Sequence, residues 1–337
     1  MPRKNSDLAK AQQSEDLEKD EYYTLYEDIA AELPQYKEFF KGKRIICPCD
    51  WDESYKEALV YKEAEYIAPI NLFSVGGTVK EISIEKSKEK LERSLDGVKC
   101  NFVKFLVAHA EEYGIKSVSV SGYNPVSGEG VRFQDIDYNN YDIVITNPPF
   151  SQVIEFFDIM MEYKDLKFLI IGPLTAIGYK NAFQYLRDNK MWLGYHAHMS
   201  GFIKPDGTVL PKNDSKVRSS CWYTNLYVAY RNDRLILTEK YDPEKYPRYY
   251  NYKKAIDVNR TSLIPYDYEG EMGVPISFLQ KYNPEQFELV ISNRLIEKSP
   301  RWRGDKANLW IEKDGKPFKC PFERIIIRNR QVEKDED

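Results

Sequence analysis

Apolar and polar positions along the middle of the chain change between the period of a strand and the period of a helix. Short apolar or alternating runs predict strands at residues 44–47, 118–120, 141–147 and 167–172. Apolar side chains at helical spacing predict helices at residues 102–110 and 151–163. Because strands that alternate with helices of this length are typical of parallel sheets with helical crossovers, we predict an α/β fold with a doubly wound, mostly parallel sheet.

The N-terminal part of the chain departs from this pattern. Residues 1–20 are charged and have no apolar period, so we expect a disordered lead there. A helix is expected over residues 22–33, where apolar side chains recur at helical spacing until Pro34 stops the run. Residues 51–95 have an irregular pattern from which no single structure is predicted.

The composition changes from about residue 236 to short segments rich in Tyr, Pro and Asn. We therefore expect a first domain at residues 21–235 and a smaller C-terminal region at residues 236–337. Within that region, Asp314 and Gly315 predict the turn of a hairpin, and residues 324–328 predict a closing strand.

The C-terminal region is also the most basic part of an acidic chain with net charge −4 and a pI near 5.7. A protein with this overall charge needs a local basic surface to bind nucleic acid. Trp302, Trp310 and Phe318 are interleaved with the cations, which suits such a surface, although a hairpin with a solvated charged face would have the same sequence. The cations are Arg294, Lys298, Arg301, Arg303, Lys306, Lys313, Lys316, Lys319, Arg324, Arg328 and Arg330.

The composition of the chain is that of a globular protein, with 42% hydrophobic and 30% charged residues in 337. It has no apolar run long enough for a bilayer and no apolar core of a secretory signal, so we expect a cytoplasmic protein without a membrane partner. The five cysteines are scattered and favour reduced thiols. Cys47 and Cys49 are one residue apart with no histidine nearby, so no metal site is predicted.

The stretch "TNPPF" follows the strand at residues 141–147 and has a composition suited to binding a planar amine. Consecutive prolines restrict two φ angles and remove two N–H donors, so Pro148 and Pro149 form a rigid, extended step. That step can present the Asn147 side-chain oxygen and the Pro148 carbonyl as two acceptors, which match the two N–H bonds of an exocyclic amine. Phe150 offers a ring face for stacking. The alternative is an ordinary strand terminator, since Asn-Pro and Pro-Pro commonly have that role.

Several segments in this order resemble the EcoRI-type adenine-specific DNA methyltransferases. They are "EYYTLYEDI", "CPCDWDES", "DIVITNPPFSQVIEFFDIMMEYKDLKFLIIG" and "IPYDYEGEMGVPISFLQKYNPEQFELV", and the resemblance covers about residues 20–330. It implies a Rossmann-like fold, a catalytic domain at residues 21–235 and a DNA-recognition region at its C-terminal side. It also implies methyl transfer from S-adenosylmethionine to N6 of a flipped adenine in a specific duplex sequence. Asn147, Pro148, Pro149 and Phe150 would then be the catalytic motif.

The same resemblance implies residues that bind the cofactor. Tyr23 and Thr24 match the motif that contacts the methionine portion, and Asp135 resembles the acid that binds the adenine of the cofactor. Asp50, with Cys49 beside it, follows the first strand, where the class has a glycine-rich loop and this chain has no glycine.

A basic loop at residues 201–222 is expected to close over DNA, with Phe202 or Trp222 as a second face for the flipped base; the alternative is an exposed, solvated loop. The expected partner is duplex DNA. A cognate restriction endonuclease would act in the same system without a stable complex, and the protein would be a monomer.

Two other classes of function fit the sequence: a methyltransferase that acts on another substrate, and a protein without catalytic activity. RNA adenine and protein glutamine methyltransferases use a similar step for a planar amine, and the basic, aromatic C-terminal region favours nucleic acid over protein. The other is a non-catalytic nucleic-acid-binding protein of the same fold, which the missing glycine loop would allow.

Overall fold

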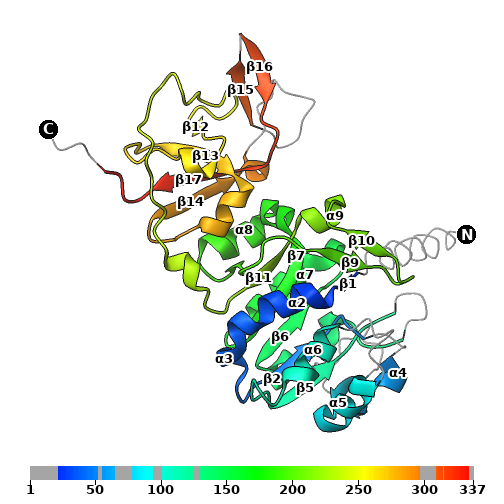
Figure 1. Cartoon of the computed structure of the whole chain (residues 1–337). Coiled ribbons are helices and arrows are strands. Elements are labelled where there is room, and N and C mark those ends of the chain that lie inside the picture. The colour runs from blue at the N-terminus through cyan, green and yellow to red at the C-terminus, as the bar shows by residue number, and fades with distance from the viewer. Residues whose placement is uncertain are drawn as a thin grey trace, which may run out of the picture. The chain divides into compact units, whose positions relative to one another are not determined.

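The computed structural model describes two compact units of the chain (Figure 1). The described residues are 22–51, 55–64, 78–93, 101–124, 129–296, 309–313 and 315–333. The lead predicted at residues 1–20 lies outside them. The first unit takes its residues from Met1–Pro173 and Gly194–Leu226, and the second from Leu174–Leu193 and Tyr227–Asp337.

The first unit contains a mixed sheet whose centre is parallel. Its described strands follow the order β3-β4-β5-β2-β6-β7-β11 within the large sheet. The four strands β5, β2, β6 and β7 pair in parallel, while β3, β4 and β11 join through antiparallel pairs. Their bounds are β2 Arg44–Cys47, β3 Tyr61–Ala64, β4 Val79–Ile82, β5 Ser117–Val120, β6 Ile143–Thr146, β7 Lys167–Pro173 and β11 Ser220–Thr224. The predicted α/β class is confirmed, as are the strands expected at these four central positions.

Strands β6 and β7, at the centre of the sheet, are buried on both faces. All four residues of β6 are buried, and so are residues 168–172 of β7. Buried parallel strands have this continuous apolar pattern, whereas half-exposed strands alternate. Since β2, β5, β6 and β7 run in one direction, their carboxyl ends lie along one edge of the sheet, where ligands bind in open α/β sheets.

The helices of the first unit connect and cover these strands. The two predicted helices are confirmed as α6, which buries Phe102, Phe105 and Leu106, and as α7, which buries Phe156 and Phe157. A 3-10 turn at Phe150–Gln152 precedes α7, so this helix begins two residues later than expected. The bounds are α2 Tyr26–Glu32, α3 Lys37–Phe40, α4 Tyr55–Ala58, α5 Ile84–Arg93, α6 Asn101–His109, α7 Val153–Glu162 and α9 Ser215–Arg218.

One expectation about the first hundred residues is wrong. The helix predicted from residue 22 begins at Tyr26, because Tyr23–Thr24 forms strand β1 and pairs antiparallel with β9, Gly201–Ile203. With β10, Val209–Pro211, these strands form a small sheet, so a long-range pairing overrides the local helical spacing. The irregular stretch at 51–95 contains α4, β3, β4 and α5 in its described parts.

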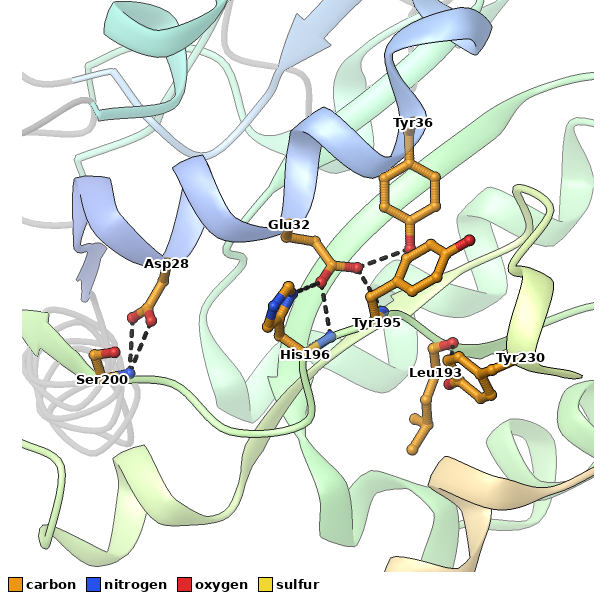
Figure 2. Close-up of polar contacts among 8 residues, drawn as sticks. All are labelled: Asp28, Glu32, Tyr36, Leu193, Tyr195, His196, Ser200 and Tyr230. Carbon is orange, nitrogen blue, oxygen red and sulfur yellow. Dashed lines mark hydrogen bonds and ion pairs between the residues drawn. The ribbon is translucent and has the colours of Figure 1, made fainter. Parts of the chain in front are cut away.

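Helix α2 is fastened to the segment that precedes β9 by two buried carboxyl groups (Figure 2). Glu32 is fully buried and accepts hydrogen bonds from the N–H groups of Tyr195 and His196, both at 2.8 Å. Its oxygens also contact His196 Nδ1 at 2.7 Å and accept from Tyr36 Oη at 2.7 Å. Asp28 accepts from the N–H of Ser200 with both oxygens at 2.9 Å. These bonds hold the helix that directly follows β1.

The second unit is built on a four-stranded sheet of order β12-β13-β17-β14 and a hairpin of β15 and β16 (Figure 1). The predicted hairpin at Asp314 and Gly315 and the predicted closing strand, which is β17, are confirmed. Gly315 has φ +70°, the left-handed conformation that its turn requires. The bounds are α8 Lys180–Arg187, β8 Trp192–Leu193, β12 Ala255–Asp257, β13 Glu271–Pro275, β14 Phe287–Ser292, β15 Trp310–Lys313, β16 Lys316–Lys319 and β17 Arg324–Asn329.

Three arginines of the basic C-terminal region form ion pairs inside this unit. Arg324 is buried and donates to Asp257 at 3.1 Å. Arg328 bridges Glu271 and Glu288, and Arg294 pairs with Glu323. The charges of these three arginines are paired with acids of the same unit, whereas Lys313 and Lys316 are exposed on the hairpin. The cations Lys298, Arg301, Arg303 and Lys306 lie outside the described residues.

Candidate active site

Strand β6 delivers Asn147 to the carboxyl edge of the sheet in a defined orientation. The side chain is 6% exposed, and its Nδ2 donates to the main-chain oxygen of Tyr22 at 2.7 Å. Because a carbonyl oxygen only accepts, this contact assigns the nitrogen and the oxygen of the amide. The Oδ1 atom is buried and has no hydrogen-bond partner among the described residues. A buried acceptor without a partner is rare in proteins, so this oxygen is available to accept a hydrogen bond from a bound donor.

Three aromatic rings gather beside the asparagine. The centroid of the Phe150 ring lies 6.0 Å from that of Tyr22 and 5.8 Å from that of Phe202. Tyr22 and Phe202 are 5.9 Å apart, so each ring contacts the other two. Lys216 donates to the Tyr22 hydroxyl, and its Nζ lies 4.6 Å from the centroid of that ring. Of the two residues expected as a second face for the base, only Phe202 is near Phe150; Trp222 is buried in β11 against Phe102.

Asp50 is hydrogen-bonded to Thr146, the residue before Asn147. It follows β2 and is 4% exposed, and its Oδ2 accepts from the Thr146 hydroxyl at 2.7 Å. Burial raises the pKa of the Asp50 carboxyl to about 7, although the bonds from Thr146 and from the Cys49 N–H oppose this shift. Since Thr146 precedes Asn147, this hydrogen bond connects the proposed cofactor loop with the strand that carries the proposed catalytic motif.

Tyr23 and Thr24 form the neighbouring strand β1, and both are buried. The Thr24 hydroxyl oxygen is buried without a hydrogen-bond partner among the described residues, and the Thr24 carbonyl accepts from Asn101 Nδ2 at 2.8 Å. Tyr22, the residue before Tyr23, contacts Asn147. The site therefore has a second unpartnered polar atom on the chain segment that touches the motif.

Two of the expected cofactor residues have other contacts. Both carboxylate oxygens of Asp135 accept from the Arg132 guanidinium, at 2.7 and 2.9 Å, in a 3-10 turn at Phe133–Asp135. Cys49 is half-buried beside Asp50 and contributes its N–H to that carboxyl group.

The residues that position the motif were not identified from the sequence. Tyr22 counted only as an apolar position of a helix, and Thr146 only as one residue of a strand. Asn101 and Ser121 had no sequence signal. The Ser121 carbonyl accepts from the N–H groups of Asp50 and Trp51, both at 3.0 Å. Each of them acts through a contact between segments far apart in the chain.

No cluster of metal ligands was found in the described part of the chain. Within the same residues, no helix is long and apolar enough to cross a membrane. The arrangement at the carboxyl edge can bind an amine through a fixed acceptor and hold a flat ring against Phe150.

Comparisons with known proteins agree with this chemistry. The chain matches the family described as adenine-specific methyltransferase EcoRI over residues 7–63 and 135–330. It is 35% identical to the type II methyltransferase M.EcoRI of Escherichia coli, over 98% of each chain. It is 26% identical to M.MpnI of Mycoplasma pneumoniae over 80% of this chain and 81% of that protein. Identity to M.MgeORF184P of Mycoplasma genitalium is 29%, over 80% of this chain and 82% of that one.

No solved structure matched the chain significantly. The family match covers most of the sequence and includes the motif at Asn147, and a relative is similar over nearly the full length. The chain belongs to the EcoRI family of adenine-specific DNA methyltransferases.

Proposed function

We propose that this protein transfers the methyl group of S-adenosylmethionine to N6 of an adenine flipped out of a specific duplex DNA sequence. The observation that carries this proposal is the buried, unpartnered Oδ1 of Asn147 at the end of β6, beside the Phe150 ring. An adenine stacked on Phe150 would donate one N6–H hydrogen bond to that oxygen and the other to the Pro148 carbonyl.

Binding both hydrogens makes the amine a better nucleophile. In the free base the nitrogen lone pair is delocalised into the ring, and two acceptors in the correct plane favour the pyramidal form in which the lone pair is available. The protein thus acts by orientation and by a fixed electrostatic environment, without a covalent intermediate.

The polar groups near β1 and β2 fit the cofactor, which supplies an electrophilic methyl group when it is bound. We assign its binding to Tyr23, Thr24, Cys49, Asp50 and Asp135. The unpartnered Thr24 hydroxyl can serve a carboxylate or an ammonium group, and the Asp50 carboxyl can pair with an ammonium group. For Asp135, a ligand would share the carboxylate with Arg132.

We assign a Rossmann-like, doubly wound arrangement to the catalytic domain and DNA recognition to the C-terminal region at residues 236–337. The parallel pairing of β5, β2, β6 and β7 supports the first assignment, and the exposed Lys313 and Lys316 support the second. We further propose a cytoplasmic monomer that forms no stable complex with a cognate endonuclease.

The test is a methylation assay with the full-length protein. Purified protein is incubated with methyl-labelled S-adenosylmethionine and either duplex DNA of mixed sequence, RNA or a protein pool, and the products are hydrolysed and separated by mass spectrometry. We expect N6-methyldeoxyadenosine from DNA alone. Methylated adenosine from RNA, methylated glutamine, or no label in DNA would contradict the proposal, and sequencing of the methylated DNA would give the target site.

A further inference from the structure

We propose that Tyr22 is a positioning residue of the active site, because its main-chain oxygen sets the orientation of the Asn147 amide and thereby requires asparagine, and not aspartate, at this position. The inference rests on the proposed function, since it concerns how the acceptor for the target amine is held. It adds a residue outside the motif to the catalytic arrangement.

The contact between Asn147 and Tyr22 has a fixed polarity. Asn147 Nδ2 lies 2.7 Å from the Tyr22 oxygen, which has no hydrogen to donate. The amide must therefore turn its nitrogen toward Tyr22 and its oxygen the other way. That oxygen is the buried atom with no partner among the described residues. A rotation of the amide would place two oxygens in contact and remove the acceptor from the site.

Tertiary contacts hold Tyr22 in place. Its ring packs between Phe150 and Phe202, with centroid distances of 6.0 and 5.9 Å, and its hydroxyl accepts from Lys216. The next residue, Tyr23, pairs with Ile203 in the small sheet. The carbonyl that orients Asn147 is thus fixed by side chains and strands from two distant parts of the chain, and the same ring contacts the aromatic residue of the motif.

A carboxylate at position 147 would behave differently from the asparagine amide. An ionised aspartate at position 147 has only acceptors, so one oxygen would face the Tyr22 carbonyl in a buried environment and be repelled. A protonated aspartate can donate its O–H to Tyr22 and still present its other oxygen to the amine. The activity of such a variant should therefore depend on pH in a way that the activity of the asparagine enzyme does not.

The experiment measures turnover of wild type and Asn147→Asp at saturating cofactor and DNA, between about pH 5.5 and about pH 8.5, and takes the ratio of the two rates at each pH. We expect the variant to be slower by roughly 100-fold at the alkaline end, as after loss of one fixed transition-state contact, with the ratio recovering as pH falls. Asn232→Asp adds the same charge at an exposed position of the second unit and should match wild type throughout.

A ratio near one at every pH, or a deficit that does not change with pH, would overturn the proposal. Titration calorimetry with S-adenosylmethionine and thermal unfolding show whether each variant is folded and binds the cofactor. If wild type methylates DNA and only this pH effect is absent, the positioning role fails while the proposed function stands. If wild type does not methylate DNA, the proposed function itself fails.

Variants of Tyr22 give an independent measurement. Tyr22→Phe keeps the ring and the carbonyl and loses the hydroxyl that accepts from Lys216, so its kcat should stay within roughly threefold of wild type. Tyr22→Ala removes the ring that fixes the carbonyl and should lower kcat by roughly tenfold or more. A Tyr22→Ala variant with the kcat of wild type would contradict the positioning role, and rescue of the rate by phenylalanine would support it.

Discussion

At the scale of single residues, the site combines an acceptor without a partner and an acid with a displaced pKa. Asn147 is oriented by Tyr22, and one residue earlier Thr146 donates to Asp50. Burial raises the pKa of Asp50 to about 7, well above that of an exposed aspartate. Thr146, the last residue of β6, thus links Asp50 with Asn147, which directly follows it. Asn147 and Asp50 can each be tested by a substitution of similar size.

Replacing Asn147 with alanine should abolish methylation without unfolding the protein. The substitution deletes the oriented acceptor, and we expect a loss of roughly 100-fold or more in kcat. The hydrogen bond to the Tyr22 carbonyl is also lost, at a cost of roughly 1 kcal/mol. Methylation assays and thermal unfolding check the two parts. Full activity in Asn147→Ala would contradict the proposed mechanism.

Replacing Asp50 with asparagine should change how stability depends on pH. A folded-state pKa above the usual value means that this group favours folding most at pH below about 4, where the unfolded carboxyl is also protonated, and that the contribution is lost as pH rises through about 7. The amide of asparagine does not ionise. Asp50→Asn should therefore be more stable relative to wild type at pH 8.5 than at pH 5, by up to roughly 3 kcal/mol.

Urea unfolding of both proteins at the two pH values tests this expectation. Asp137→Asn, at a capping carboxyl that accepts from the Asn139 N–H, is a control for the loss of one acid elsewhere in the same unit. An equal stability difference between wild type and Asp50→Asn at both pH values would show that Asp50 does not titrate as the structure implies.

At the scale of elements, the position of the motif depends on the segment from β1 to α2. Glu32 and Asp28 of α2 accept hydrogen bonds from N–H groups of residues 195–200 (Figure 2). Strand β1 pairs with β9 just beyond them. Gly194 permits this approach, since an added Cβ there would overlap Glu32 Oε1. Tyr22 lies at the start of this segment, so the fastening of α2 supports the orientation of Asn147.

Replacing Glu32 with glutamine should destabilise the first unit. The amide nitrogen of the glutamine is itself a donor, and it would face main-chain N–H groups from which the carboxylate accepts hydrogen bonds. A buried mismatch between two donors costs roughly 2 to 3 kcal/mol. Urea unfolding measures the loss. Glu27→Gln, at an exposed position of the same helix, is the matched control and should be neutral. Equal stability of the two variants would disprove the fastening role.

The loss in Glu32→Gln should also depend on pH. The hydrogen bond with Glu32 raises the pKa of His196, so this pair contributes its full stability below the ordinary histidine value and loses it as pH rises through the raised pKa. The difference between wild type and Glu32→Gln is therefore expected to be larger at pH 6 than at pH 9, with the size reduced by the partial exposure of the imidazole.

At the scale of the whole molecule, an acidic protein must bind an acidic polymer. The net charge is −4, and several arginines of the basic C-terminal region pair with acids of their own unit. The exposed lysines of the hairpin at β15 and β16 do not belong to these pairs, and Lys313 lies 5.4 Å from the centroid of the exposed Phe318 ring. A local surface of this kind can attract phosphate where the total charge does not.

The double variant Lys313→Gln and Lys316→Gln should weaken DNA binding and reduce its salt dependence. If each lysine neutralises one phosphate, the slope of log K against log salt should fall by roughly 0.9 for each lysine removed. Binding titrations at several salt concentrations measure the slope. Lys86→Gln, on exposed α5 of the first unit, should leave it unchanged. A double variant with the wild-type slope would remove the hairpin from the DNA interface.

The sequence by itself determined the central strands, the helices α6 and α7 and the motif at Asn147. These features are local: buried strands need continuous apolar runs, and a pair of prolines ends a strand wherever it occurs. The hairpin and strand β17 were also predicted, because a turn at Asp-Gly and a run of isoleucines are signals contained in a few residues.

Only the tertiary structure decided how those parts act together. Strand β1 overrides a helical pattern because its partner β9 lies far along the chain. Arg324, counted among the surface cations, is buried against Asp257 for the same reason. The contacts of Asn147 with Tyr22 and of Asp50 with Thr146 join positions about a hundred residues apart. Local sequence contains no information on such distant partners, so the motif could be identified from the sequence while the groups that orient it could not.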